Sequence, residues 1–294
     1  NNYDSTVKCH IAAKYWRFRG KFNPQNQPEI RNEGYQTLKD IMELYQYREM
    51  LKNLVRKDLR TRYKGSFFGF LWTFINPLLQ LLVYTVIFTT IMRFDIKNYA
   101  MFLFVALLPW IFFSNSLIGS TGSIINNKEL IKKIFFPREI IPISVVTSGF
   151  VNLILSFVIV FIALFISGIG ITPAVVCLPV VLLAVYVMTL GFSLLFSALN
   201  VYVRDLEHIL GIVTMAWFYF TPVIYQVDMI PAKFLKLFFL NPMTPITLAF
   251  RDILYYGKAP DFTILGINLA TGVLLTIFGH QVFRKLQKNF AEEI

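Results

Sequence analysis

Charged residues divide this chain into long intervals that contain none of them. A transmembrane helix needs about 20 consecutive, mainly apolar residues to cross the hydrocarbon core of a bilayer. The longest interval holds 64 residues, from 140 to 203, which is enough for two helices, and a turn at 167–172 just before Pro173 divides it. The pattern therefore predicts six membrane spans, at about 67–92, 99–120, 142–166, 173–199, 208–226 and 262–283.

The distribution of Lys and Arg indicates how these spans are oriented. Because their predicted number is even, both termini lie on the same side of the membrane. The segments on that side hold 16 Lys and Arg residues, whereas the opposite loops hold 6. Basic residues accumulate on the cytoplasmic side, so we expect both termini in the cytoplasm. The first group comprises 37–64, 121–141, 200–207 and 284–294, and the second comprises 93–98, 167–172 and 227–261.

The composition favours an all-α membrane protein and excludes two other classes. Hydrophobic residues make up 56% of the 294 residues and charged residues 15%, against about 25% charged in a typical soluble domain. A soluble protein would expose too much apolar surface, and a disordered chain would be more polar. The net charge of +11 could indicate nucleic-acid binding, but the basic residues flank the predicted spans. We therefore expect a membrane-surface role for them and no nucleic-acid partner.

Residues 1–36 are polar and aromatic, with an Asn- and Pro-rich middle. We interpret them as a cytoplasmic extension with little regular structure. They lack an apolar core of the length that a cleavable signal peptide needs. Cys9 and Cys177 are far apart in the sequence and indicate neither a disulfide framework nor a metal site.

Residues 37–60 have the apolar and polar spacing of an amphipathic helix. A basic amphipathic helix ahead of the first span is typical of a segment that lies in the membrane interface. We therefore predict an interface helix within 37–64, with a simple membrane anchor as the alternative. Its apolar side would carry Leu38, Ile41, Leu44, Tyr45, Leu51, Val55 and Leu59, and its polar side Lys39, Glu43, Gln46, Asn53 and Lys57.

Two further segments are neither spans nor ordinary loops. Residues 126–135 mix charges with Leu, Ile and Phe between an Asn pair and Pro137, which predicts a short cytoplasmic helix with a docking surface. The alternative is a solvated loop whose apolar residues dip into the interface. In 227–261, two apolar stretches are too short to span, which predicts two re-entrant half-helices at the outer face.

The sequence lacks the motifs of several classes of enzyme and of nucleotide-binding protein. The chain has no G-x-x-x-x-G-K-[ST] phosphate loop, no H-E-x-x-H and no G-x-S-x-G. Asp205-Leu206-Glu207 is the nearest approach to a D-x-D pair, and we interpret it as a charged inner helix end. Within the spans, His280 near an inner end is almost the only ionisable group, which argues against an ion-coupled carrier. An active transporter of this kind would need ATP hydrolysis from a separate subunit.

Four stretches, in order, carry a resemblance to a known family over about residues 40–290. The sequence resembles the membrane subunit of an ABC exporter of the ABC-2 type, in the polysaccharide branch. That branch moves lipid-linked O-antigen, capsule or wall teichoic acid. The stretches are Arg60-Thr61-Arg62-Tyr63-Lys64 with Trp72 and Asn76-Pro77; Phe136-Pro137-Arg138-Glu139-Ile140-Ile141-Pro142; Asn200-Val201-Tyr202-Val203-Arg204-Asp205-Leu206; and Thr221-Pro222-Val223-Ile224-Tyr225 followed by Asn241-Pro242-Met243-Thr244-Pro245.

The resemblance implies an ABC-2 (type V) exporter fold in a bacterial plasma membrane. It implies a homodimer of this chain with two ABC ATPase subunits, which bind ATP and Mg²⁺, so that this chain holds no cofactor, metal or catalytic residue. The segment 126–135 becomes a coupling helix, and 227–261 the re-entrant helices that close the exit. Residues implied in coupling are Asn127, Lys128, Glu129, Leu130, Lys132, Lys133, Arg204 and Asp205, and those of the interface helix are Arg56, Arg60 and Arg62.

A polymer path needs many weak contacts, which aromatic rings can give to the C–H faces of sugars. Tyr and Trp also gather at membrane interfaces, which is the alternative explanation for each ring. An ABC-2 drug or lipid exporter, a membrane-embedded glycan transferase and an inert assembly subunit are alternative functions. The candidate path residues are Trp72, Phe74, Tyr84 and Phe88 in the first span and Trp217, Tyr219, Phe220 and Tyr225 in the fifth.

Overall fold

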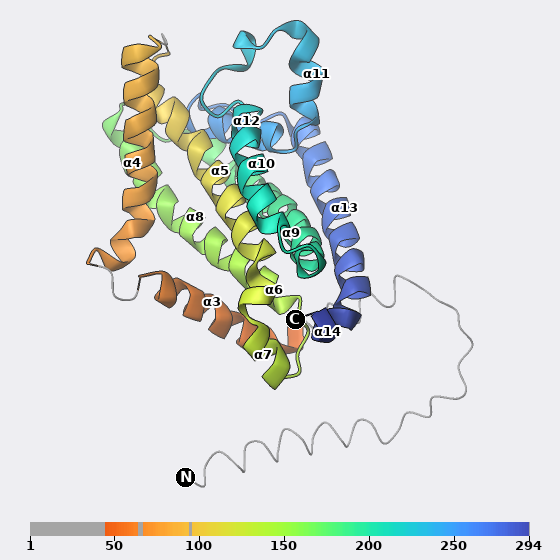
Figure 1. Ribbon diagram of the computed structural model, residues 1–294. Coiled ribbons are helices and arrows are strands. Elements are labelled where there is room, and N and C mark those ends of the chain that lie inside the picture. Colours follow the sequence, from red (N-terminus) through yellow and green to blue (C-terminus); the bar gives the residue numbers. More distant parts are fainter. Residues whose placement is uncertain (1–44, 64–66, 94–95, 294) are drawn as a thin grey trace. The chain divides into compact units, whose positions relative to one another are not determined.

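The computed structural model describes residues 45–63, 67–93 and 96–293, and every regular element among them is a helix (Figure 1). The predicted all-α fold is therefore confirmed. The predicted extension 1–36 and residues 37–44 of the predicted interface helix lie outside the described residues.

Among the described residues, five helical segments are long and apolar enough to cross a membrane. They confirm a multi-pass membrane protein and agree with five of the six predicted spans within a few residues. Three of them join an α-helix to a short helix of another type. The segments are Gly69–Ile91 (η1 Gly69–Leu71, α4 Trp72–Val86 and η2 Ile87–Ile91), α5 Tyr99–Thr121, α8 Ile140–Ile166, Pro173–Tyr202 (η3 Pro173–Cys177 and α9 Leu178–Tyr202) and Phe262–Asn289 (α13 Phe262–Leu286 and η5 Gln287–Asn289).

The segment predicted as the fifth span differs from the other five. Its helix, α10, spans only the 14 residues Leu206–Tyr219. At 1.5 Å per residue it is about 21 Å long, shorter than the ~30 Å hydrocarbon core. Residues 220–226 continue in turns, because Pro222 lacks an N–H and disfavours helical backbone at Thr221. The predicted helical span 208–226 is therefore too long at its C-terminal end.

Helix α5 lies at the centre of the packing. Every side chain from Met101 to Trp110 is buried. It contacts α4, α8, α9, α10 and α12 (Met243–Leu254). A helix that is apolar on all sides and surrounded by others is typical of a core helix. By contrast, α4 buries only Thr73 and Pro77 and exposes a long apolar surface.

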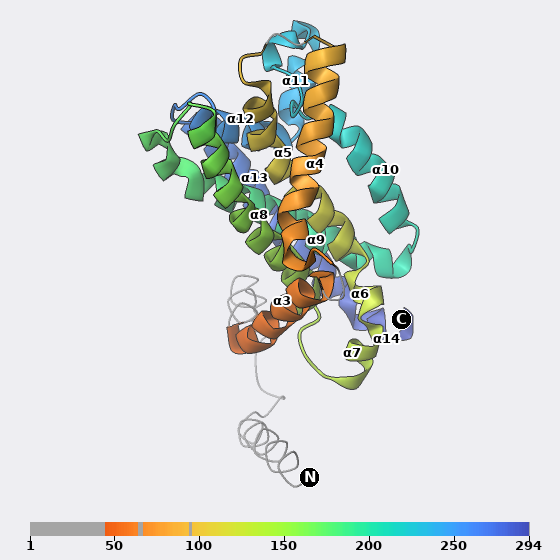
Figure 2. The same ribbon diagram turned by 90° about the vertical axis from the view of Figure 1, so that its left-hand side faces the viewer.

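Short helices occupy the two ends of the helical bundle, as Figures 1 and 2 both show. At one end lie α3 (Arg48–Tyr63), α6 (Ser123–Asn126), α7 (Lys128–Lys133) and α14 (Phe290–Glu293). At the other lies α11 (Ala232–Leu240), which follows η4 (Val227–Met229). Helix α7 is shorter than the segment predicted for it, because the backbone leaves the helix at Asn127 and is extended at Ile134. Two short helices, α11 and α12, occur within 227–261, and their depth in a membrane stays a prediction.

Candidate functional site

A groove of about 280 Å³ lies between α4, α5 and α10. We call it the α4–α5–α10 groove. Its lining includes Gln80 and Tyr84 from α4, Trp110 and Asn115 from α5, and Tyr219 from α10. These side chains combine aromatic faces with amide donors and acceptors, and no Asp, Glu, Lys or Arg of the described residues lines the groove. Such a surface suits a neutral, hydroxyl-rich ligand better than an ion.

The aromatic rings of this groove support one another. Tyr84 stacks on Phe218 with ring centroids 5.7 Å apart, and Trp110 packs against the same ring at 5.6 Å. Phe218 is buried and forms the back of the cluster, whereas Tyr219 is 54% exposed. Offset and tilted pairs at these distances are favourable, so the rings hold each other in place. The α4–α5–α10 groove therefore has rigid aromatic walls rather than isolated rings.

A second groove, of about 300 Å³, lies between α4, α5 and α8. Trp72 and Asn76 line it from α4, and Asn152 and Ser156 from α8. Asn115 lines both grooves, so an amide of α5 is shared between them. Polar groups inside membrane spans are costly and usually functional. The sequence prediction considered only ionisable and aromatic residues and missed these amides, although Asn and Gln within apolar spans were visible in the sequence.

The eight aromatic residues predicted for the path lie in different surroundings. Trp72, Tyr84 and Tyr219 line the two grooves. Trp217 instead packs on Phe113 with ring centroids 5.2 Å apart, and its Nε1 donates to Asn241 Oδ1 at 2.8 Å. The other four line neither groove. Phe74 packs on Phe70, Phe88 on Tyr99, and Phe220 and Tyr225 on Phe238 of α11.

A buried arginine fixes the end of the bundle near α11 and α12. Arg251 of α12 is 1% exposed and donates to the carbonyl oxygens of Phe102 at 3.3 Å, Tyr225 at 3.2 Å and Val223. Its guanidinium also lies 3.6 Å from the centroid of the Phe102 ring. Tyr99 of α5 donates its hydroxyl to the Ile224 carbonyl oxygen at 2.8 Å. The turn after α10 is therefore tied to both α5 and α12.

At the opposite end, α7 has an exposed charged face and an apolar underside. Leu130 and Ile131 are half-buried and pack on a cluster that includes Ile140 and Phe283. The exposed charges are those of Lys128, Glu129, Lys132 and Lys133, and Glu129 Oε2 lies 3.3 Å from Lys133 Nζ. Phe135 follows and is 88% exposed. The predicted coupling residues on this helix thus form a basic surface beside an exposed aromatic ring.

The neighbourhood of α7 is linked to several helices. Gly122, just before α6, packs against the Glu207 carboxylate so closely that a methyl group there would lie 2.3 Å from Glu207 Oε2. The Glu207 backbone N–H donates to Asn200 Oδ1 at 3.1 Å. Arg204 Nη2 donates to the Glu293 carbonyl oxygen at 3.1 Å, and its neighbour Asp205 is exposed. The predicted inner turn therefore connects α9, α10 and the segment that leads to α7.

The segment after α7 is anchored to α13 and to the helices that follow it. Arg138 donates to the Gln287 carbonyl oxygen and lies over the Phe290 ring at 5.8 Å. Burial lowers the pKa of the Arg138 guanidinium, which nevertheless stays charged at neutral pH. Glu139, which is buried, lies 3.0 Å from His280 Nδ1 of α13. Movement of α7 would therefore be transmitted to α8 and α13.

Helix α3, which lies within the predicted interface helix, is held against α8, where the Ser148 hydroxyl donates to the Asp58 carboxylate. Arg56 and Arg60 border a cavity beside it, whereas the Arg62 side chain lies outside the described residues.

Within the described part of the chain, no group of three His, Cys, Asp or Glu residues could hold a metal ion.

Comparison with known proteins places this arrangement among transporters. Residues 49–255 match the family described as ABC-2 type transporter. The O-antigen export system permease protein RfbA of Myxococcus xanthus is 39% identical over 256 residues, which cover 86% of this chain and 98% of that protein. RfbA of Klebsiella pneumoniae is 37% identical over 247 residues, or 83% of this chain and 94% of that protein. The polysialic acid transport protein KpsM of Escherichia coli is 23% identical over 233 residues, or 76% and 88%.

Proposed function

Because this chain belongs to the ABC-2 transporter family, we propose that it is the membrane-spanning permease subunit of an ATP-driven exporter of a lipid-linked polysaccharide. The observation that carries the proposal is the similarity, over most of the chain, to permeases named for O-antigen export. The uncharged, aromatic and amide-lined grooves beside α4 support a glycan cargo. The export would run outward across a bacterial plasma membrane.

The proposed topology has six crossings in the ABC-2 (type V) exporter fold. Helix α10 together with the turns at 220–226 would complete the fifth crossing, although α10 alone is too short. The end that carries α3, α7 and α14 would face the cytoplasm, because the basic segments gather there. The end that carries α11 would face outward, with α11 and α12 as the re-entrant pair.

The proposed assembly is a homodimer of this chain with two ATPase subunits. The ATPases bind ATP and Mg²⁺, and this chain contributes no catalytic residue. The exposed apolar surface of α4, which includes Leu79, Leu82 and Val86, supports contact with a second copy or with lipid. The α4–α5–α10 groove opens at Tyr219, which is half-exposed, so a second copy could complete its wall.

In the proposed mechanism, closure of the ATPases on ATP pushes against α7. The exposed charges of α7 provide the contact, and its half-buried Leu130 and Ile131 transmit the movement to the bundle. The sugars would slide over Tyr84 and Tyr219. Each sugar unit of the polymer can make the same weak contact with an aromatic ring, and no single unit is bound tightly. The amides of Gln80 and Asn115 would exchange hydrogen bonds with successive hydroxyl groups.

Native mass spectrometry of the protein, purified gently from its own host membranes, tests the assembly and the cargo. We expect two copies of this chain with two ATP-binding subunits, together with the mass of a glycan–lipid. Recovery of the chain without any ATPase, at every detergent concentration tried, would contradict the proposal. Small-molecule cargo in place of a glycan–lipid would instead indicate a drug or lipid exporter.

The coupling role of α7 needs a separate measurement in proteoliposomes that contain the ATPase. We expect the double substitution Glu129→Ala/Lys132→Ala to leave ATP hydrolysis in place while it lowers the polymer exported per ATP at least about tenfold. The matched control is Lys288→Ala/Glu293→Ala, which removes one acid and one base from exposed positions at the same end. Equal export per ATP in both variants would show that α7 is not the coupling element.

A further inference from the structure

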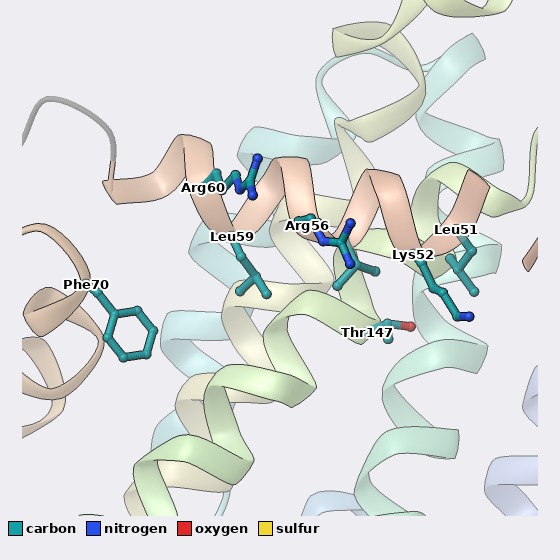
Figure 3. A pocket seen from close by; sticks show the side chains of 8 residues that line it. Leu51, Lys52, Arg56, Leu59, Arg60, Phe70 and Thr147 are labelled. Carbon is teal, nitrogen blue, oxygen red and sulfur yellow. The ribbon is translucent and has the colours of Figure 1, made fainter. Parts of the chain in front are cut away.

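A cavity of about 610 Å³ lies beside α3, bounded also by the start of the first span and by α8 (Figure 3). Its apolar lining comes from Leu51, Val55 and Leu59 of α3 and from Phe70 of η1. Figure 3 shows Leu59 directed toward α8 and the Phe70 ring approaching from the neighbouring helix. The cavity is separate from the two grooves beside α4, which share none of these residues. It is large enough for part of a lipid.

Three cations line the same cavity. Lys52, Arg56 and Arg60 are four residues apart in succession, so they form one stripe along α3 with about 6 Å between neighbours. Lys52 Nζ is bound to Glu49 Oε1 at 2.8 Å. In the described part of the chain, neither Arg56 nor Arg60 has a carboxylate partner. Two guanidinium groups that form no ion pair among the described residues therefore lie beside an apolar lining.

The combination of these features defines the ligand that would fit. A guanidinium forms paired hydrogen bonds with phosphate oxygens, which a single ammonium group cannot do. A basic amphipathic helix in the interface is attracted to anionic lipids, and its apolar residues pack among the acyl chains. The cavity offers both kinds of contact within the span of a single lipid. A soluble anion would leave the apolar lining uncovered.

We propose that this cavity binds one anionic phospholipid of the cytoplasmic leaflet. The phosphate lies between Arg56 and Arg60, and the upper part of an acyl chain packs against Leu59 and Phe70. The Asp58–Ser148 hydrogen bond holds α3 at a fixed distance from α8, which keeps the cavity open. The bound lipid would join α3 to the start of the first span. This inference concerns a resident lipid and does not depend on the exported polymer.

Titration of defined lipids into the detergent-purified assembly, followed by native mass spectrometry, tests the proposal. We expect phosphatidylglycerol to bind with one tight site per copy of this chain, and phosphatidylcholine to bind at least about tenfold more weakly. The substitution Arg56→Gln/Arg60→Gln should weaken phosphatidylglycerol binding at least about tenfold. Arg60→Lys should weaken it less than Arg60→Gln, because the charge stays while the paired hydrogen bonds are lost.

The control is Arg48→Gln/Lys57→Gln, which removes the same charge from α3 but leaves the lining of the cavity unchanged. We expect it to change the tight site less than about twofold. Equal weakening by both double variants would indicate diffuse attraction to α3 and overturn the proposal. Should the Arg56/Arg60 double variant be lost during purification, the single Arg60→Gln and Arg60→Lys variants carry the comparison.

Two other occupants are outcomes of the same experiment. A polyisoprenyl phosphate that binds tightly while phosphatidylglycerol does not would assign the cavity to a cargo carrier and overturn the proposal of a resident phospholipid. Inorganic phosphate that displaces the lipid at equal concentration would show that the acyl chain contributes nothing, and would also overturn it. A tight site that requires both the anionic headgroup and the acyl chains, and that Arg56→Gln/Arg60→Gln removes, supports the proposal.

Discussion

The contact between α9 and α13 gives a quantitative test of the packing of the helical bundle. These two helices lie together along much of their length. Gly191 of α9 faces the backbone of α13, and a methyl group at this position would lie 2.8 Å from Thr276 N and 2.9 Å from the Leu275 carbonyl carbon. A methyl group at Gly279 would lie 2.6 Å from the Gly191 carbonyl oxygen. Since the neighbours are backbone atoms, no side chain can rotate to make room.

The cost of Gly191→Ala follows from these distances. Ordinary contact begins near 3.4 Å, so the helices would have to separate by roughly 0.6 Å at this point. Overpacking of a well-packed interface costs typically about 1–3 kcal/mol in the free energy of unfolding. The hydrogen bond from Thr276 Oγ1 to the Val187 carbonyl oxygen, at 3.0 Å, would also lengthen, and such bonds are worth about 0.6 kcal/mol in membranes. We therefore expect a loss of about 1–3 kcal/mol in total.

Thermal unfolding of the detergent-purified protein, followed by loss of the monodisperse elution peak, measures this effect. A loss of this size lowers the midpoint by about 2–10 °C in a protein of 150–250 residues or somewhat more. Gly266→Ala on α13 is the matched control, because nothing lies within 4 Å of its added methyl group. Helix propensity then favours Ala slightly. A Gly191→Ala midpoint equal to that of Gly266→Ala would refute the argument from close backbone contact.

Two further predictions concern the end of the bundle that carries Arg251 and the proposed path. Arg251→Gln should lower the same thermal midpoint by several degrees, because the Val223 carbonyl oxygen and its neighbours lose a charged donor. Exposed Lys236→Gln should have almost no effect, and equal midpoints would contradict the role of Arg251 as an anchor. Tyr219→Ala should weaken cargo binding about 3–10-fold, since an aromatic contact is worth about 0.5–1.5 kcal/mol, and Tyr219→Phe should weaken it much less. If both substitutions weakened binding equally in a titration, ring stacking at this position would be excluded. Both substitutions spare the hydrogen bond from Tyr225, which uses the backbone oxygen of residue 219.

The spans were predictable because the bilayer imposes one requirement on every residue they contain. Charged side chains are excluded over the whole thickness of the hydrocarbon core. An interval without charge therefore marks a crossing, whichever neighbouring helix each face of the span contacts. The same rule misjudged the end of α10. The sequence stays apolar past Thr221-Pro222, so hydropathy gives no sign that the helix ends there. The end of α10 is set by the backbone restrictions of proline, which the transfer energies of side chains do not include.

The grooves were harder to predict, because an apolar span has no polar side from which an inward face could be deduced. Trp217 and Tyr219 are both aromatic and two residues apart, yet one packs in the core and the other borders the α4–α5–α10 groove. The residues that carry information in this setting are the uncharged amides. Asn115 lines both grooves, and its cost in an apolar span was already apparent from the sequence.

Helix α5 connects the three regions that the proposed mechanism requires. Its N-terminal part is held by Arg251, its middle contributes Trp110 and Asn115 to the α4–α5–α10 groove, and its C-terminal end leads through Gly122 toward α7. Pro109 lies between Phe102, which Arg251 holds, and the groove residues Trp110 and Asn115, and a proline inside a helix removes one hydrogen bond and permits bending. In the proposed mechanism, a push at α7 would therefore move the C-terminal part of α5 while its N-terminal part stays fixed to α12. The α4–α5–α10 groove would change shape without release of the contact with Arg251.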